Sequence, residues 1–405
     1  MIGVASLVLA AVPSFSALSL DDAMSRVVNS SAAVATARAV VRQRDSDFRL
    51  AKTGGFPHLI GDYSLSPQAA PTGPTTVEQH FLTVGAGISV NDILNASANT
   101  RVAAAELLAA QRDADTAAMQ ARAGAIKLYF AALQAIAVES VRRETVIAAQ
   151  RDRNAARIRA RLGESPHLDE LRAEVTLAQA RADLARATAD RANAVDALAS
   201  AARVDANGLA GSAAQTTAEP AEPPDEARAV TRALASRPEL ASLLASLDAR
   251  NAAVAVARQS AWPTLTANGG YQGGVDTAIP VHGPEAAVHL DVPLAPGTND
   301  RVASAQAQAD AAEVQLLEER RTIALDVAAA VRTARAAATA QSAAERARDE
   351  AQRSLAAVEL GYREGASSSL DVADARRTYA QAAVDALVAE YERAQDNALL
   401  RALVP

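Results

Sequence analysis

Histidine is the residue of this sequence best suited to general-base catalysis or metal binding, and it occurs at five positions: His58, His80, His167, His282 and His289. None of them lies in a His-Glu-x-x-His arrangement, and the chain has no cysteine to complete a metal site. The nucleophile motif Gly-x-Ser-x-Gly and a phosphate-binding loop are also absent. We therefore expect no enzymatic activity, no cofactor and no metal site.

Two aspartates, Asp371 and Asp374, are spaced so that both carboxylates lie on one face of a helix. The segment before them, Tyr362 to Leu370, predicts a turn between two long helices, because the flanking stretches are rich in alanine and free of Gly and Pro. Gly365 is suited to cap the first helix at its C-terminus. Hydroxyl groups for the N-cap of the second helix are supplied by Ser367, Ser368 and Ser369. The segment therefore predicts a helical hairpin.

A second turn of the same kind occurs one half-chain earlier. One offset of 202 residues separates Gly163 from Gly365, Leu168 from Leu370, and Asp169 from Asp371. Such agreement indicates an internal duplication, so a function assigned to the turn must tolerate two versions of it.

The composition argues against thick globular cores in this chain of 405 residues. Half of the residues are hydrophobic, but only 3% are aromatic and alanine dominates. Alanine buries little area, favours helices and allows close helix packing, so long and thin helical packing is expected. The net charge of −7, with Arg interleaved among Asp and Glu, disfavours a nucleic acid partner.

The N-terminus predicts a signal peptide over residues 1–16. An apolar run from Ile2 to Val12 precedes Pro13 and a small-x-small triplet that ends at Ser16. No Lys or Arg precedes this run, which leaves open a start codon further upstream or a short buried helix instead. No later run approaches the roughly 18 consecutive apolar residues of a membrane-spanning helix, so membrane entry would require strands.

Each half of the chain also contains a change from helical to alternating periodicity. The predicted strands are about nine to ten residues long, as in tilted membrane-spanning β-strands, and lie at 58–66, 81–90, 263–271 and 286–294. Four such strands cannot close a transmembrane barrel, so two or three chains would have to combine their strands.

The predicted organisation is therefore mainly α with a small β part. It comprises a first repeat (17–204, with a β-hairpin at 57–91 and a tip near Gly163), a linker (205–224), and a second repeat (225–405, with a β-hairpin at 263–294 and a tip near Gly365). Within the first repeat, one helix of about 70 residues, roughly 100 Å, is expected after Asn91, with Ile126, Phe130 and Leu133 on its apolar face.

In this order and at these spacings, several short motifs resemble those of the outer membrane factors, the TolC-like efflux channel proteins. The motifs are Tyr362-Arg363-Glu364-Gly365 with Leu370-Asp371-Val372, Arg237-Pro238-Glu239-Leu240, Leu18-Ser19-Leu20-Asp21-Asp22-Ala23, and Ala261-Trp262-Pro263. The resemblance covers about residues 18 to 403.

The resemblance implies a homotrimer in the bacterial outer membrane. Twelve strands would form one β-barrel in outer membrane lipid, and twelve helices would form a periplasmic tunnel, an α-barrel. The hairpin tips would meet a periplasmic adaptor protein and an inner-membrane transporter of an efflux or type I secretion system.

The resemblance also implies roles for particular residues. Asp371 and Asp374 match acidic residues that ring the pore entrance and favour cations, although Asp371 is equally explained by the first turn of a helix, where Asp is favoured. Tyr362 matches a gate residue that bonds to the neighbouring hairpin, although plain packing in its own helix explains it equally well. Where a family example carries an arginine two residues after the turn glycine, this chain has Ser367. Exposed small and apolar residues at the tips are expected to dock the adaptor: Leu162, Gly163, Leu168, Gly365 and Leu370.

The alternative is a non-conducting structural coiled-coil protein of the cell envelope. That interpretation explains the helices but leaves the two strand hairpins, at matched places in the repeats, without a role.

Overall fold

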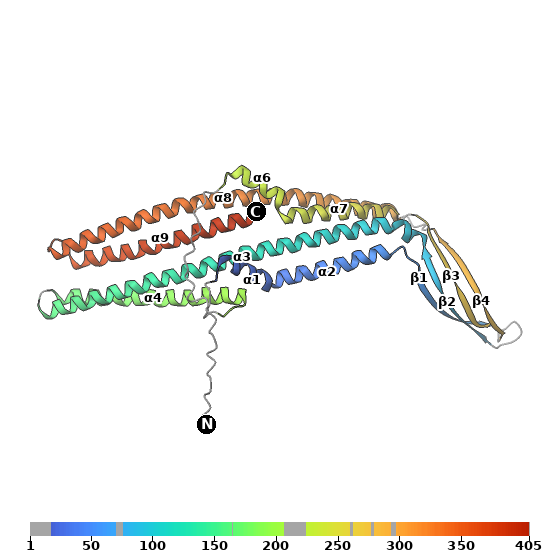
Figure 1. The fold of residues 1–405 in the computed structure, drawn as a ribbon, viewed down its shortest axis with the longest axis horizontal. Helices are drawn as coiled ribbons and strands as arrows, with labels where there is room; N and C mark the ends of the chain where they lie inside the picture. Colours follow the sequence, from blue (N-terminus) through green and yellow to red (C-terminus); the bar gives the residue numbers. More distant parts are fainter. Residues whose placement is uncertain are drawn as a thin grey trace, which may run out of the picture. The chain divides into compact units, whose positions relative to one another are not determined.

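The computed structural model describes residues 18–69, 76–163, 165–205, 224–259, 262–276, 279–292 and 297–404. The predicted signal peptide and most of the predicted linker lie outside these residues. Figure 1 shows the elements in chain order: α1 (Leu20–Ser30), α2 (Ala32–Thr53), β1 (His58–Ala69), β2 (Thr76–Ser89), α3 (Val90–Arg161), α4 (His167–Ala202), α6 (Glu226–Ser236), α7 (Pro238–Gln259), β3 (Thr264–Asp276), β4 (Ile279–Asp291), α8 (Thr298–Arg363) and α9 (Ser369–Leu403).

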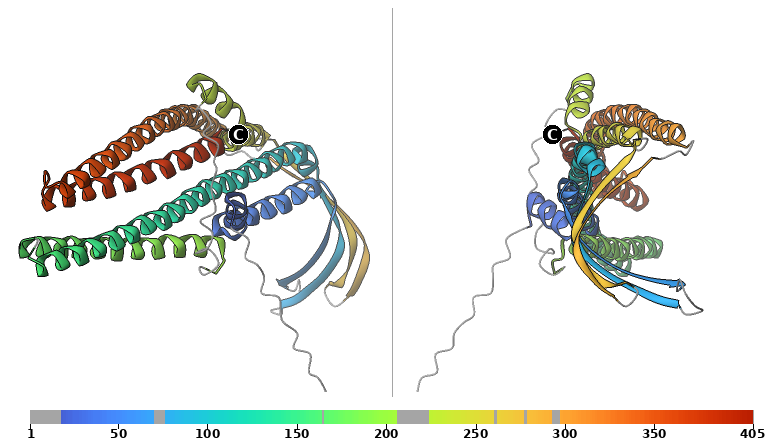
Figure 2. Two further views of the ribbon diagram at one scale, coloured as in Figure 1. Left: turned by 60° about the vertical axis from the view of Figure 1, so that its left-hand side comes forward. Right: turned by 90° about the vertical axis from the view of Figure 1, so that its right-hand side faces the viewer.

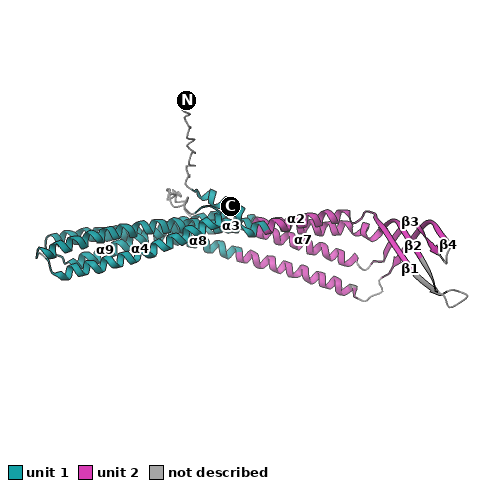
Figure 3. Ribbon diagram, turned by 90° about the horizontal axis from the view of Figure 1, so that it is seen from below, with its two compact units in different colours: residues 1–35, 117–237, 323–405 teal, residues 36–116, 238–322 magenta. Residues whose placement is uncertain are grey.

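These elements form two compact units, each of which draws on both halves of the sequence (Figure 3). Unit 1 contains residues 1–35, 117–237 and 323–405, and unit 2 contains residues 36–116 and 238–322. The helices α3, with 72 residues, and α8, with 66 residues, contribute to both units. The predicted long helices and both hairpin turns are confirmed.

The helical stretch before each strand hairpin could be expected to form one continuous helix from its sequence, but it forms two: α1 and α2 in the first repeat, α6 and α7 in the second. The first breaks at Ser31 and the second at Arg237, both with extended backbone angles. Pro238 explains the second break, because a proline disfavours helical geometry in the residue before it. The two breaks are 206 residues apart, the same offset that separates Pro57 from Pro263, so the interruption itself is duplicated.

The core of unit 1 is thin and rich in alanine, as the composition predicts. Ile126, Phe130 and Leu133 of α3 are each less than 8% exposed, which confirms the predicted apolar face. They pack with Val195, Leu198 and Ala199 of α4 and with partly buried residues of α9. The two helical hairpins of unit 1 are drawn in teal in Figure 3: α3 from residue 117 with α4, and α8 from residue 323 with α9.

Unit 2 contains one antiparallel sheet in the order β1-β2-β3-β4. The hairpin of the first repeat therefore pairs with that of the second through β2 and β3, which leaves β1 and β4 as the edges of the sheet within the chain (Figure 2).

The strands are longer than predicted, at 12 to 14 residues each. Pro67, Pro280 and Pro284 all lie outside the predicted strands, but they belong to β1 or β4. Proline is tolerated there because an edge strand does not need every backbone N–H for pairing inside the sheet.

The register gives the sheet two unlike faces. One face carries Leu59, Tyr63, Val84, Tyr271 and Val288, all at least 50% exposed. The other face is polar, with residues such as Asp62, Thr83, Gln272 and Glu285. A soluble sheet buries its apolar face, so this exposed one requires an apolar environment.

Two described helices, α3 and α7, are also long and apolar enough to cross a membrane by length and composition alone. Their apolar windows of 18 residues are 39% and 28% buried within the chain. Buried core helices commonly have the same composition, so these helices do not by themselves indicate a membrane span.

Candidate functional site

The two hairpin turns of unit 1 have the local geometry that the glycines predict. Gly365 adopts φ +80°, and Gly163 adopts φ +75°, a left-handed conformation that costs glycine little. At the second turn, Ala366 N–H donates to Gly361 O at 2.8 Å and Gly365 N–H donates to Tyr362 O at 3.2 Å. This pair of bonds is a Schellman cap, which satisfies carbonyl groups at the end of α8.

The two turns differ at the next helix start. Ser368 is the N-cap of α9: its hydroxyl accepts from Asp371 N–H at 3.2 Å, and the Asp371 carboxylate accepts from Ser368 N–H at 2.8 Å. The equivalent N-cap of α4, 202 residues earlier, is Pro166, which makes no side-chain cap. Of the three serines proposed as caps, Ser368 is therefore the one that acts.

Asp371 is committed to this capping box. Hydrogen bonds from the backbone and then the side chain of Ser368 hold the pKa of the Asp371 carboxyl below its usual range. The side chain is exposed, but it turns back to its own helix start, so local capping is a sufficient explanation for this aspartate.

Asp169, the counterpart of Asp371 in the first repeat, instead faces the other hairpin. Its Oδ1 accepts a 2.5 Å hydrogen bond from the hydroxyl of Ser369 in α9. Because Pro166 offers no hydroxyl or N–H group to it, this carboxylate is available for the contact between hairpins.

Asp374 forms an ion pair with Arg377, one turn further along α9, and its side chain is 61% exposed. The position equivalent to Asp374 in the first repeat is occupied by a cation, Arg172. The acidic character predicted for this region is therefore partly balanced by arginines.

Tyr362 contacts the other hairpin of the same chain. Its hydroxyl accepts a 3.0 Å hydrogen bond from Arg159 Nη1 of α3, and the Arg159 guanidinium lies 5.4 Å from the ring centroid. This contact joins α8 to α3 near the tip and accounts for a polar aromatic residue at this position.

Arg376, which sequence reasoning missed, is the most connected side chain of the region. It forms an ion pair with Asp152 of α3 and donates to Glu359 Oε1 of α8 at 2.6 and 3.0 Å, so one guanidinium from α9 joins three helices. Its side chain is 32% exposed. Desolvation lowers the pKa of the Arg376 guanidinium, but from so high a usual value that it stays cationic at neutral pH.

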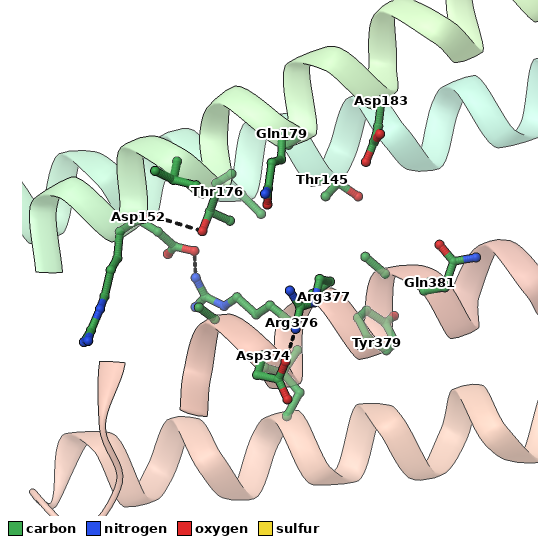
Figure 4. A pocket seen from close by; sticks show the side chains of 18 of the residues that line it. Thr145, Asp152, Thr176, Gln179, Asp183, Asp374, Arg376, Arg377, Tyr379 and Gln381 are labelled. Atoms are coloured by element: carbon green, nitrogen blue, oxygen red, sulfur yellow. Dashed lines mark hydrogen bonds and ion pairs between the residues drawn. The ribbon is translucent and has the colours of Figure 1, made fainter. Parts of the chain in front are cut away.

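These residues border a cleft of about 1040 Å³ between the two hairpins of unit 1 (Figure 4). All four helices line it, with Val141 and Asp152 from α3, Leu168 and Val175 from α4, Glu359 from α8, and Leu370 and Asp374 from α9. Figure 4 shows Arg376 reaching across the cleft from α9 to Asp152. Both apolar and charged side chains line it.

The predicted tip residues do not all belong to this cleft. Leu168 and Leu370 line it and are 52% and 55% exposed, whereas Leu162 is 66% exposed outside it. A side chain added at Gly163 or Gly365 would meet open space, so both turns are freely accessible.

The polar side chains of this region form ion pairs and hydrogen bonds between helices. Among the described residues, no group of three or more His, Cys, Asp or Glu side chains is placed to hold a metal ion. What the tip contains instead is a set of ion pairs and hydrogen bonds that fasten α9 and α8 to α3 and α4.

The sequence matches the model of a known protein family. The profile of the outer membrane efflux protein family matches the chain twice, over residues 23–202 and 229–404. These two matches agree with the internal duplication. No curated protein matches the sequence significantly.

Several solved structures share the fold. The MtrE outer membrane channel of Neisseria gonorrhoeae, solved in its open state, is 19% identical, with 95% of this chain and 88% of that chain covered and a TM-score of 0.78. The CmeC outer membrane channel of Campylobacter jejuni is 17% identical, with 96% and 88% covered and a TM-score of 0.79. The outer membrane protein VceC of Vibrio cholerae is 17% identical, with 95% of both chains covered and a TM-score of 0.78.

Proposed function

Because this chain belongs to the outer membrane efflux protein family, we propose that it forms a passive trimeric conduit from the periplasm to the cell exterior. The chain is a protein of the bacterial outer membrane with a helical periplasmic extension. The conduit would be the outer membrane part of a tripartite efflux or type I secretion system.

The observation that carries this proposal is the sheet of unit 2. It has two edges, β1 and β4, and an exposed apolar face opposite a polar one. Four strands are too few to enclose a lumen, and in a membrane unpaired edges are costly. Three copies pairing β1 with β4 would supply twelve strands and leave no edge.

The four long helices of each chain would then form the wall of a tunnel of twelve helices. The boundaries proposed for the duplicated units are 17–204 and 225–405, joined by the linker 205–224. A signal peptide over residues 1–16 would direct export.

The test is conductance across planar lipid bilayers, with the oligomeric state measured in detergent by light scattering. We expect trimers that produce discrete current steps. Folded trimers that carry no current would favour the alternative, a non-conducting envelope protein, and would overturn the proposal.

The cleft of unit 1 and the tips beside it are the proposed docking surface for a periplasmic adaptor protein, which in turn engages an inner-membrane transporter. Leu168 and Leu370 present exposed apolar surface in the cleft, and Leu162, Gly163 and Gly365 present accessible surface at the turns. Exposed apolar groups rimmed by charged ones are typical of protein contact sites.

Charge substitution at the cleft tests this docking. Leu370→Asp should reduce recovery of the adaptor with the channel after cross-linking in cells, while leaving bilayer conductance intact. Leu325→Asp is the matched control, because Leu325 is 68% exposed on α8 but lies outside the cleft. Equal loss of adaptor in both variants would argue against a specific docking surface.

We also propose Asp374 as the main pore-entrance carboxylate, with Asp371 contributing charge from within its capping box. Tyr362 and Arg376 would hold the closed arrangement, since each contacts a helix of the other hairpin. Ser367 is not part of this proposed lock.

A further inference from the structure

Equivalent helices of the two repeats in unit 2 are buried to different extents. The helices α2 and α7 are each 22 residues long, and they start 206 residues apart, at Ala32 and Pro238. In α7, Ser242, Ala245 and Ala249 are buried and lie on one face, at the spacing i, i+3 and i+7. These three residues form the buried stripe of α7.

The equivalent face of α2 is exposed. Thr36, Ala39 and Gln43 occupy the three matching positions, and each of them is exposed. Leu50, two turns further along this face, is 68% exposed, whereas its counterpart Val256 in α7 is half-buried. Exposed surface of this kind is typical of protein contact sites. Among the described residues, nothing covers this face of α2 as the stripe of α7 is covered.

The element that covers α7 is α3 of the first repeat. The Ser242 hydroxyl donates a 2.5 Å hydrogen bond to Asp113 Oδ1 of α3, and further along Val256 of α7 and Val102 of α3 line one groove. The two helices therefore run in opposite directions. Because α3 follows β2 and α7 precedes β3, their contact continues the pairing of β2 with β3. The two repeats thus meet along one intrachain seam, which runs from the sheet into the helices.

The duplication predicts a second seam of the same kind. The elements equivalent to β2 and α3 are β4 and α8, and those equivalent to β3 and α7 are β1 and α2. Of these, β1 and β4 are the two edges of the sheet within the chain. The chain therefore carries both halves of the seam on two unlike surfaces. Copies that repeat such a head-to-tail contact form a closed ring.

The two long helices align residue by residue in this region. The sequence Arg-Val-Ala occurs at 101–103 of α3 and again at 301–303 of α8, an offset of 200 residues. Ala109 and Ala309, at the same offset, are both buried, at 8% and 7% exposure. Residues of α8 can therefore be assigned to positions of α3 here.

The hydroxyl and the carboxylate of the intrachain seam both have counterparts. Thr36 occupies the position of Ser242, Glu313 occupies that of Asp113, and both Thr36 and Glu313 are exposed. The pair is thus Ser with Asp inside the chain and Thr with Glu on its two free surfaces. Each residue is one carbon larger, and the roles of donor and acceptor are kept.

From these observations we propose that α8 of a second copy of this chain covers the exposed face of α2. In this contact the Thr36 hydroxyl donates a hydrogen bond to the carboxylate of Glu313 of the partner subunit. The contact presupposes the trimeric assembly of the proposed function, and it assigns the helix faces and side chains that hold two subunits together. A hydrogen bond to a charged acceptor gives such a contact specificity as well as area.

Disulfide cross-linking tests the alignment, because the chain has no cysteine of its own. One turn beyond Ser242, the buried residues Ala245 and Ala110 lie opposite each other in the antiparallel arrangement. The equivalent residues between copies are Ala39 and Asp310. Ala39→Cys/Asp310→Cys should therefore oxidise to a covalent trimer on a denaturing gel without reductant. Ala110→Cys/Ala245→Cys should form its disulfide inside the monomer.

Arg38→Cys/Asp310→Cys is the matched control for the cross-link. Arg38 is exposed and adjacent to Ala39, but its counterpart Leu244 is 43% exposed even though α3 covers α7. This pair should cross-link about tenfold more slowly, because the two Cβ atoms do not approach to disulfide distance. Equal rates for the two pairs, or trimers without a cross-link between positions 39 and 310, would overturn the seam.

A charge substitution tests the hydrogen bond itself. Thr36→Asp would place two carboxylates together, so trimers in detergent should dissociate about fivefold faster. Adding Glu313→Arg to this variant should restore the parent rate. Arg42→Asp is the control, because Arg42 lies off the face and its counterpart in α7 is already an exposed aspartate, Asp248. An unchanged rate in Thr36→Asp, or an equal loss in Arg42→Asp, would contradict the proposed contact.

The seam and the conduit can fail separately. Cross-linked trimers that carry no current would refute the conduit and support the seam. Conducting trimers that do not cross-link between positions 39 and 310 would refute the seam and leave the conduit standing.

Discussion

The Ser369 hydroxyl donates a 2.5 Å hydrogen bond to Asp169 Oδ1, and this bond joins the first turns of α9 and α4. The two aspartates at equivalent positions of the repeats, Asp169 and Asp371, therefore have different hydrogen-bond partners. Asp371 caps its own helix with Ser368, whereas Asp169, whose turn has Pro166 in place of that serine, binds the neighbouring hairpin.

The bond between Ser369 and Asp169 should contribute measurable coupling. We expect Ser369→Ala and Asp169→Asn each to raise the open fraction of the channel, and the double variant to add little to either. A hydrogen bond to a charged group predicts a coupling of about 1–2 kcal/mol in a double-mutant cycle. Open probability in planar bilayers supplies the measurement, and strictly additive effects would show that the bond does not hold the tip closed.

Removing Arg376 should open the entrance more than any other single change at the tip. Arg376→Gln breaks the contacts with Asp152 and Glu359, and a loss of about 2 kcal/mol would favour the open state about thirtyfold. The variant should therefore show a higher open probability at rest.

Arg377→Gln provides the control for this experiment. Arg377 is the adjacent residue, is 74% exposed, and pairs with Asp374 within its own helix. It should leave the open probability at rest unchanged, and a similar rise in both variants would mean that charge rather than bridging matters.

Ion selectivity should respond in opposite directions to changes at Asp374 and Arg377. Asp374→Asn removes a carboxylate and should weaken cation preference and block by multivalent cations, whereas Arg377→Gln removes its counter-ion and should strengthen both. At an exposed site each effect is at most about 1 kcal/mol, or about fivefold in permeability ratio. Reversal potentials in a salt gradient would measure it, and no change in either variant would exclude Asp374 from the ion pathway.

The capping box of Ser368 and Asp371 should stabilise the start of α9 less at low pH, because the Asp371 carboxylate becomes protonated. The pKa of Asp371 is lower in the folded chain than in the unfolded one, so its stabilisation is fully present above the ordinary carboxyl pKa of about 4. It is lost as the pH falls through the depressed folded pKa. Hydrogen-exchange protection of residues 369–374 should therefore be lower in Asp371→Asn than in the parent at neutral pH.

This difference in protection should disappear in strong acid, once the parent carboxyl is also protonated. Ser368→Ala serves as the companion variant, because it removes the hydroxyl that Asp371 uses. A difference between Asp371→Asn and the parent that stays constant down to the lowest pH would assign the effect to something other than the carboxylate charge.

Local patterns predicted the long helices and both hairpin turns of this chain correctly, because their signals lie close together in sequence. Gly365, Ser368 and the apolar face through Phe130 are examples, since each is defined by neighbours within a few residues. The strands were predicted too short for the same reason. The predicted strands leave out Pro67 and Pro280, and only the pairing partners of β1 and β4 show that these edge positions tolerate proline.

The contacts of the candidate site could not be predicted in this way. Arg376 and Asp152 are more than 200 residues apart, and helix periodicity gives no information about which faces of two separate hairpins meet. The run of two arginines after Asp374 was the available signal, because adjacent cations on an alanine-rich helix need acidic partners in other helices.

The unlike turns at Gly163 and Gly365 also decide the symmetry of the proposed entrance. Three chains would place six turns around the opening, but a turn ending in Pro166 alternates with one ending in Ser368. The ring can then have only three-fold symmetry. In each chain, α9 is capped by its own Ser368, and Ser369 of the same hairpin binds Asp169 of the α3–α4 hairpin.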